Sequence, residues 1–129
     1  MEPRTAIFRL RVTDVMGALP PSAPPDTALS EAARALGDSG ASGLVVVEST
    51  GCPLGILTEH DITRRVVFKT EAHTPVAEVM TQPVRCISDD DYLYRAIATM
   101  RRSGLRHMPV TDTAGRLCGM LNLDDALGA

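Results

Sequence analysis

The sequence predicts an α/β protein, of the mixed α+β kind, built from two β-α-β-β-α repeats that are related by a pseudo-two-fold axis. The main observation is that landmarks of the chain recur at a constant spacing of 64 residues. The segment 12–16 returns at 76–80, and Ser39-Gly40 returns as Ser103-Gly104. Each copy also carries one helical stripe followed by two short apolar runs. Two copies of one unit in 129 residues predict a single globule with a functional cleft where the copies meet.

The first strands of the two repeats are expected to differ in how well they can pair with a neighbouring strand. The segment 20–25 of the first repeat holds four prolines. Because proline cannot donate to a strand ladder, this strand is predicted to lie at an edge or to be degraded. The matching stretch of the second repeat, Val84-Arg85-Cys86-Ile87, predicts an ordinary short strand.

The next element of the first repeat is an amphipathic helix. Its apolar side chains fall at i, i+3, i+4 and i+7, which places them on one face. They are Leu29, Ala32, Ala33 and Leu36. We expect Asp26 or Thr27 to cap the start of this helix and Gly37 to end it.

The corresponding helix of the second repeat follows an acidic run, Asp89-Asp90-Asp91. Asp90 or Asp91 is expected to cap its start, and Gly104 follows its end. A metal site is the alternative use of these carboxylates. Capping is favoured because the dipole at a helix start attracts negative charge.

Two short strands and a second helix complete each repeat. Apolar runs predict the strands at 44–47 and 54–57, and again at 108–110 and 117–121. The closing helix is predicted from Glu59 to about Phe68, and its counterpart starts near Leu123 and is cut short at Ala129. We therefore expect a first repeat with its lead-in at 1–68, a linker at 69–74 and a second repeat at 75–129.

Composition excludes several classes of function. The chain is 44% hydrophobic and 22% charged, which is typical of a soluble globular protein. A net charge of −3, with two Phe, two Tyr and no Trp, argues against a nucleic-acid partner. No apolar run approaches the roughly 20 residues that span a membrane. Three cysteines without metal-ligand spacing predict reduced thiols, a cytoplasmic location and no metal site.

The ordered landmarks resemble a cystathionine-β-synthase (CBS) domain pair, also called a Bateman module. The resemblance rests on Asp14-Val15-Met16, the Ser39-Gly40 turn, Gly55-Ile56-Leu57-Thr58-Glu59-His60-Asp61 and Gly104-Leu105-Arg106-His107-Met108-Pro109-Val110. It covers nearly everything from Val12 to Leu127. It implies a regulatory module that binds AMP, ADP, ATP or S-adenosylmethionine between its repeats, requires no cofactor and dimerises.

The sharpest candidate site is Gly55-x-x-Thr58-x-x-Asp61. Thr58 ends a predicted strand and opens a helix, so its hydroxyl and the first free N–H groups suit an anion or a sugar oxygen. Asp61 can accept hydrogen bonds from a ribose diol, and the resemblance implies ribose and phosphate here. The alternative is a helix capping box, in which both side chains satisfy backbone donors. The two roles can coexist.

The remaining candidate ligand residues follow from repetition and resemblance. Asn122 and Asp125 are the counterparts of Thr58 and Asp61. The resemblance implies that basic residues before a strand face phosphates, that two strands grip adenine, and that the second repeat's first strand roofs the site. These residues are Arg106 and His107; Leu44, Val45, Met108 and Pro109; and Pro83, Val84 and Cys86. The alternatives are a solvated arginine, a half-buried histidine and plain core strands.

No nucleophile-and-base pairing is suggested by order or spacing, so we expect no enzymatic activity. Two hypotheses remain. The first is a ligand sensor that signals through the geometry of a homodimer to an effector protein. The second is a dimerisation or protein-interaction module whose ligand site has decayed. The prolines at 20–25, Asn122 and the short last helix favour the second hypothesis. The residues that favour the first are Thr58, Asp61, Arg106 and His107.

Overall fold

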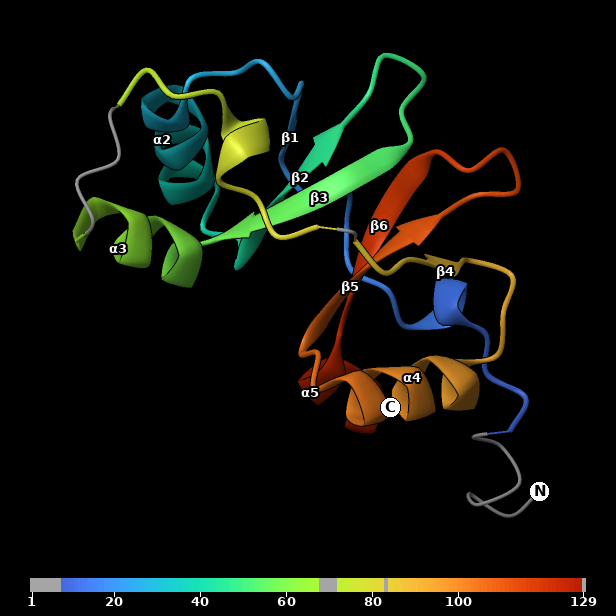
Figure 1. Cartoon of the computed structure of the whole chain (residues 1–129). Helices are drawn as coiled ribbons and strands as arrows, with labels where there is room; N and C mark the ends of the chain where they lie inside the picture. The colour runs from blue at the N-terminus through green and yellow to red at the C-terminus, as the bar shows by residue number, and fades with distance from the viewer. Residues whose placement is uncertain (1–7, 68–71, 83, 129) are drawn as a thin grey trace. The chain divides into compact units, whose positions relative to one another are not determined.

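The computed structural model describes residues 8–67, 72–82 and 84–128 (Figure 1). The chain forms two compact units. The middle unit spans Pro20–Val84, and the terminal unit joins the chain up to Leu19 with the chain from Arg85 onward. Each unit contains one three-stranded sheet with helices, so the predicted mixed α/β class is confirmed.

The middle unit has the predicted order of strand, helix, strand, strand and helix, followed by a 3-10 helix. Its elements are β1 (Ser22–Ala23), α2 (Leu29–Ser39), β2 (Gly43–Val47), β3 (Pro53–Thr58), α3 (Glu59–Val67) and η2 (Val76–Glu78). Strand β2 lies between β1, which is parallel to it, and β3, which is antiparallel. Figure 1 shows α2 and α3 on the same side of the β2–β3 hairpin. The apolar stripe of α2 packs there into the core of the unit.

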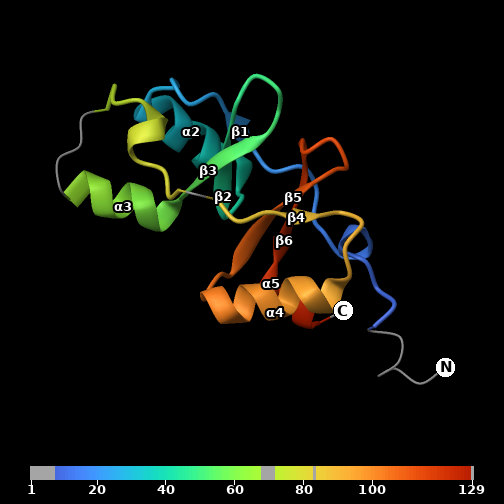
Figure 2. The same cartoon turned by 45° about the vertical axis from the view of Figure 1, so that its right-hand side comes forward.

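The terminal unit repeats this plan. Its elements are η1 (Val12–Asp14), β4 (Ile87–Ser88), α4 (Leu93–Ser103), β5 (His107–Thr111), β6 (Leu117–Asn122) and α5 (Leu123–Leu127). Strand β5 is again central, with β4 parallel and β6 antiparallel to it. Helices α4 and α5 lie side by side beneath the sheet (Figure 2). A separate aliphatic core fills this unit.

The β2–β3 and β5–β6 hairpins match residue for residue. Gly43 pairs with Thr58 in the middle unit, and His107 pairs with Asn122 at the equivalent positions of the terminal unit. Every other β2–β3 pair also has a counterpart 64 residues later, and the same bulge interrupts both hairpins. The repeat seen in the sequence is therefore a repeat of backbone hydrogen bonding.

Each compact unit contains the lead segment of the other sequence repeat, which is residues 10–17 for the first repeat and 74–81 for the second. The N–H of Val12 in η1 donates to the carbonyl of Asp91 at 2.9 Å, and the N–H of Val76 in η2 donates to the carbonyl of Thr27 at 2.7 Å. Val12 is buried in the terminal core and Val76 in the middle core. The compact units therefore differ from the sequence repeats in the lead segment that they contain. The division into 1–68, 69–74 and 75–129 concerns the sequence repeats and stays a prediction.

The predicted side-chain caps at the first helices are wrong. Helix α2 starts after Ala28 and α4 after Tyr92, and neither residue makes a side-chain cap. Carbonyls of the lead segments serve instead. Thr74 accepts from the N–H of Leu29 at 2.8 Å, and Leu10 accepts from the N–H of Leu93 at 2.8 Å. Because a docked backbone satisfies these donors, Asp26 and Thr27 are not needed as caps.

Four elements can be compared with their expected boundaries, and two of them, α2 and β4, differ. Helix α2 continues through Gly37 and ends at Gly40, whose φ of 68° is the left-handed conformation that favours glycine. Gly104 ends α4 in the same way, as predicted. The proline-rich stretch forms only the two-residue edge strand β1, as predicted, and the strand predicted at 84–87 is shifted to β4.

Among the described helices, none is long and apolar enough to cross a membrane.

Candidate functional site

The strongest candidate site lies where β3 runs into α3 in the middle unit. The carboxylate oxygen Oδ2 of Asp61 accepts from the backbone N–H and from the hydroxyl of Thr58, both at 3.0 Å. In return, the Thr58 hydroxyl oxygen accepts from the N–H of Asp61 at 3.2 Å. This reciprocal arrangement is a capping box, so the predicted capping role is confirmed. It fixes the Asp61 carboxylate in one orientation.

The other carboxylate oxygen of Asp61 is weakly held. Its Oδ1 accepts from the hydroxyl of Thr81 at 3.4 Å, which is long against the 2.5–3.0 Å usual for O–H···O bonds. An open hollow of about 200 Å³ lies here, lined by Asp61, Arg64, Val79, Met80, Thr81 and Gln82. Pockets for whole drug-sized ligands measure roughly 300–1,000 Å³, so this hollow has room for part of such a ligand. Asp61 therefore presents an acceptor to a small polar group.

Gly55 brings Thr81 to this place. A Cβ atom added at Gly55 would lie 2.9 Å from the carbonyl oxygen of Thr81 and would collide with the side chain of Met80. Without that atom, Thr81 exchanges two backbone hydrogen bonds with Ile56, at 2.9 and 3.1 Å. The glycine that opens the Gly55-x-x-Thr58-x-x-Asp61 pattern is thus needed for close packing of the lead segment on β3.

The equivalent junction of the terminal unit has lost most of these groups. Asn122 caps α5 by accepting from the N–H of Asp124 at 2.9 Å, so the reciprocal box is absent. Asp125 is exposed, and within the described part of the chain its side chain makes no hydrogen bond. The positions of Thr81 and Arg64 are taken by Gly17 and Gly128. An acidic side chain remains, but the hydroxyl and the cation beside it do not.

Arg106 and His107 lie at the start of β5 in the terminal unit. The guanidinium of Arg106 is 3.1 Å from both carboxylate oxygens of Asp124, and the two side chains are 67% and 70% exposed. Such an exposed pair contributes little to stability. Burial lowers the pKa of the half-buried His107, the charge of Arg106 lowers it further, and Asp124 opposes both. His107 is therefore mainly neutral at pH 7.

The apolar candidates are divided between the units. Leu44 and Met108 are fully buried and belong to the two cores, as the core-strand interpretation predicts. Val45 and Pro109 are also buried. Their contacts with a ligand stay a prediction.

Of the three residues predicted to cover the ligand, Pro83, Val84 and Cys86, the structure describes two. Val84 ends the middle unit, Cys86 lies in the terminal unit, and both are half-buried. Pro83 lies outside the described residues. The roofing role of these three residues stays a prediction.

Two residues of the hollow, Thr81 and Gln82, were missed by sequence reasoning. Arg64 is readable from the sequence as part of the charge pair Arg64-Arg65, for which a solvated helix face is favoured over a phosphate contact or a dimer salt bridge. A signal for Thr81 exists, because it directly follows Met80 of the repeated segment 76–80. Its approach to Asp61 depends on the docking of the lead segment on β3, which is a long-range contact.

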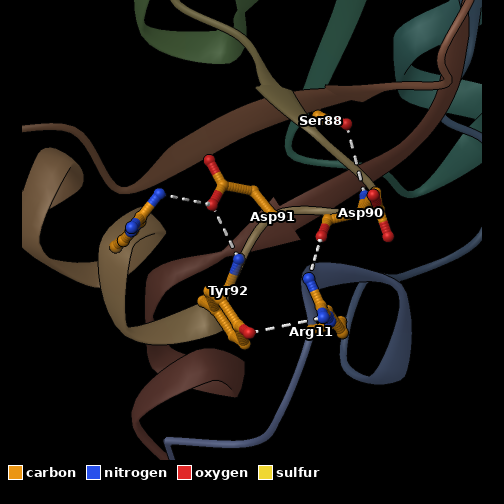
Figure 3. A network of polar contacts seen from close by, with 6 residues as sticks. Arg11, Ser88, Asp90, Asp91 and Tyr92 are labelled. Carbon is orange, nitrogen blue, oxygen red and sulfur yellow. Dashed lines mark hydrogen bonds and ion pairs between the residues drawn. The ribbon is translucent and has the colours of Figure 1, made fainter.

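The acidic run before α4 contacts both its own helix start and the distant Arg11 (Figure 3). Asp91 accepts from the N–H of Tyr92 at 2.8 Å and lies 3.7 Å from Arg95. The carbonyl of Asp90 accepts from the guanidinium of Arg11 at 2.7 Å, and that guanidinium stacks on the Tyr92 ring at 4.1 Å. Among the described residues, no three His, Cys, Asp or Glu side chains gather as metal ligands do.

Comparisons with known proteins agree with this architecture. The sequence profile of the CBS domain matches residues 12–67 and 76–129. An uncharacterized 17.7 kDa protein of Acidianus ambivalens is 30% identical over 101 residues, which is 78% of this chain and 61% of that relative. The chain thus matches less than two thirds of that relative's length.

Solved structures resemble the chain over most of its length. The CBS domain protein PAE2072 from Pyrobaculum aerophilum, complexed with AMP, matches 90% of this chain and 89% of its own, with a TM-score of 0.81 and 25% identity. The CBS domain pair of protein MJ0100, in complex with 5-methylthioadenosine and S-adenosyl-L-methionine, matches 92% of this chain and 94% of its own, with a TM-score of 0.81 and 24% identity. The chain belongs to the CBS domain family and carries two copies of the domain.

Proposed function

We propose that this protein is a regulatory module that binds an adenosine-containing ligand at the hollow beside Asp61. The observation that carries the proposal is the state of the Asp61 carboxylate. One of its oxygens is anchored by Thr58, and the other has only the long 3.4 Å contact with Thr81. The hydroxyl groups of a ribose diol donate hydrogen bonds to this second oxygen at a distance shorter than the 3.4 Å of the Thr81 contact.

The capping box prepares the site before the ligand arrives. Because Thr58 donates twice to Oδ2, the carboxylate does not have to be ordered when the sugar binds. Groups held in their bound geometry bind more tightly, since less entropy is lost on association. A hydrogen bond to a charged acceptor contributes about 1.5–3 kcal/mol. Capping and ligand binding are therefore compatible uses of one aspartate.

AMP, ADP, ATP and S-adenosylmethionine all carry the adenosine that the proposal requires. The binding of AMP by the similar PAE2072 protein supports this ligand class. We propose no catalytic step and no required cofactor. The proposed ligand also links α3, through Asp61, to the lead segment of the other repeat, through Thr81. Tightening that link shifts the conformational equilibrium, and we propose that a homodimer passes the shift to an effector protein.

Thermal unfolding and calorimetric titration with the four ligands test the proposal. A ligand at 100 times its dissociation constant raises the free energy of unfolding by about 2.7 kcal/mol. Asp61→Asn is expected to weaken binding about ten- to a hundredfold. Asp125→Asn, at the equivalent position of the terminal unit, is the matched control and is expected to bind as the wild type does. Absence of binding by all four ligands would refute the proposal.

A second candidate function is a protein-interaction module without a ligand. The terminal unit favours it, because Asn122 makes no reciprocal box with Asp125 and both residues lack a hydroxyl neighbour such as Thr81. Sedimentation measurements separate the two functions. A stable dimer that binds none of the four ligands supports the interaction module. A dimer whose sedimentation changes on addition of AMP supports the sensor.

A further inference from the structure

Arg64 is the cationic residue of the hollow beside Asp61. It lies on α3 one turn beyond Asp61, is exposed, and lines the hollow together with Thr81 and Gln82. Residues at i and i+3 on a helix are neighbours, with about 5–6 Å between their Cβ atoms. The hollow therefore offers an acceptor and a cation side by side on one helix face.

The guanidinium of Arg64 is uncommitted. Within the described part of the chain it donates no hydrogen bond and forms no ion pair. Arg106, by contrast, is paired with Asp124, and Arg95 with Asp91. An uncommitted guanidinium donates two parallel hydrogen bonds to a phosphate, a geometry that a lysine ammonium cannot reproduce.

The terminal unit supplies an internal comparison. The residue equivalent to Arg64 is Gly128, which follows α5. The helix that carries Asp125 therefore holds no cation at this position. The shared backbone plan therefore does not require an arginine here, and Arg64 gives the middle unit's hollow a cation that the equivalent place in the terminal unit lacks.

We infer that Arg64 determines ligand specificity, making the hollow beside Asp61 select adenosine ligands that carry a 5′-phosphate. This inference rests on the proposed function. The sugar hydroxyls bind Asp61, and the 5′ substituent, on the other side of the sugar ring, reaches the neighbouring guanidinium. Uncharged 5′ substituents give that guanidinium no partner. The ligand class is therefore a 5′-phosphorylated adenosine nucleotide rather than adenosine or 5′-methylthioadenosine.

Calorimetric titrations with AMP, adenosine and 5′-methylthioadenosine test the inference. The wild type is expected to bind AMP about tenfold or more tightly than adenosine, the effect of one charge-assisted hydrogen bond. Arg64→Gln is expected to lower AMP affinity to that of adenosine while leaving adenosine affinity unchanged. Arg64→Lys is expected to keep part of the preference. Arg34→Gln, which alters an exposed arginine of α2, is the control and is expected to bind like the wild type.

The possible outcomes are distinct. Equal affinities for AMP and adenosine in the wild type overturn the inference. So does an Arg64→Gln variant that keeps the preference for AMP, and in both cases the proposed function survives because adenosine binds. A wild type that binds none of the three ligands overturns the proposed function and the inference together. A preference for AMP that weakens as ionic strength rises supports the role of Arg64.

Discussion

The middle and terminal units share a backbone plan but differ in the polar side chains at the junction of strand and helix. Their hairpins pair at positions 64 residues apart, with the bulge in the same place, and both accept a lead segment against a glycine of the last strand. At the junction of strand and helix, Thr58 is replaced by Asn122 and Thr81 by Gly17. The comparison teaches that backbone pairing and a glycine contact are common to both units, whereas the polar side chains at the junction, which the proposed binding uses, differ between them.

The largest expected effect concerns the glycine contact that both units share. Gly55→Ala places a Cβ atom 2.9 Å from the carbonyl of Thr81 and against Met80. Overpacking of this kind costs about 1–3 kcal/mol. Gly37→Ala is the matched control, since nothing lies within 4 Å of its added Cβ inside α2, and it is expected to stabilise by about 0.5–1 kcal/mol. Urea unfolding measures both changes, and similar values for the two variants would contradict the close-packing role.

The next largest effect is a difference in stability between variants of the two equivalent aspartates. Asp61→Ala removes a carboxylate that accepts two hydrogen bonds from Thr58, and loss of a cap costs about 0.5–2 kcal/mol. Asp125→Ala removes an exposed side chain and is expected to change stability by less than about 0.5 kcal/mol. Thermal unfolding without ligand measures the difference. Equal costs would mean that the capping box does not distinguish the units.

A smaller effect is expected from exchanging the cap residues. Thr58→Asn and Asn122→Thr each give one unit the cap of the other. Asn and Thr are both good caps, so stability is expected to change by less than about 1 kcal/mol. Ligand affinity is expected to fall several-fold in Thr58→Asn, because the hydroxyl that orients Asp61 is lost. Unchanged AMP affinity in that variant would show that this orientation is unimportant.

The smallest effect concerns His107, which has no counterpart in the middle unit because Gly43 occupies that position. Its pKa is lowered in the folded protein. The unfolded chain therefore binds more protons below about pH 6.5, and stability is expected to fall as the pH drops through that range. His107→Gln is expected to remove this part of the pH dependence.

The neighbours of His107 supply a test with opposite signs. Arg106→Gln removes a cause that lowers the pKa of His107, so the pKa is expected to rise. Asp124→Asn removes a cause that raises it, so the pKa is expected to fall. An NMR titration of the histidine measures both shifts. Shifts in the same direction would contradict the assignment of these causes.

Much of the fold could be predicted because its signals are local. The apolar stripe of α2 and the runs that form β2 and β3 are readable from periodicity, and the 64-residue spacing fixes their partners in the terminal unit. The helix starts were mispredicted because their donors are satisfied by the carbonyls of Thr74 and Leu10, which lie far from them in sequence. Capping rules consider only residues next to the helix start in the sequence, so they do not take such contacts into account.

The candidate site was also predictable only where its residues are close together in the sequence. Thr58 and Asp61 were found because a capping box is a pattern within four residues. Thr81 was missed, since its proximity to Asp61 requires the docked lead segment. Arg64 lies one turn from Asp61 on α3, but its place in a hollow with Thr81 depends on the same docking. The equivalence of Asp125 to Asp61 is visible in the sequence, but which neighbouring groups Asp125 lacks depends on the three-dimensional lining of the hollow.

The most direct test of the central claim is an NMR titration of the wild type with AMP, followed through assigned backbone amides. We predict that the largest shifts occur at Thr58, Asp61 and Thr81 in the middle unit, with smaller shifts at Asn122 and Asp125. Shifts centred on Asn122 and Asp125, with Thr58 and Asp61 unchanged, would contradict the account.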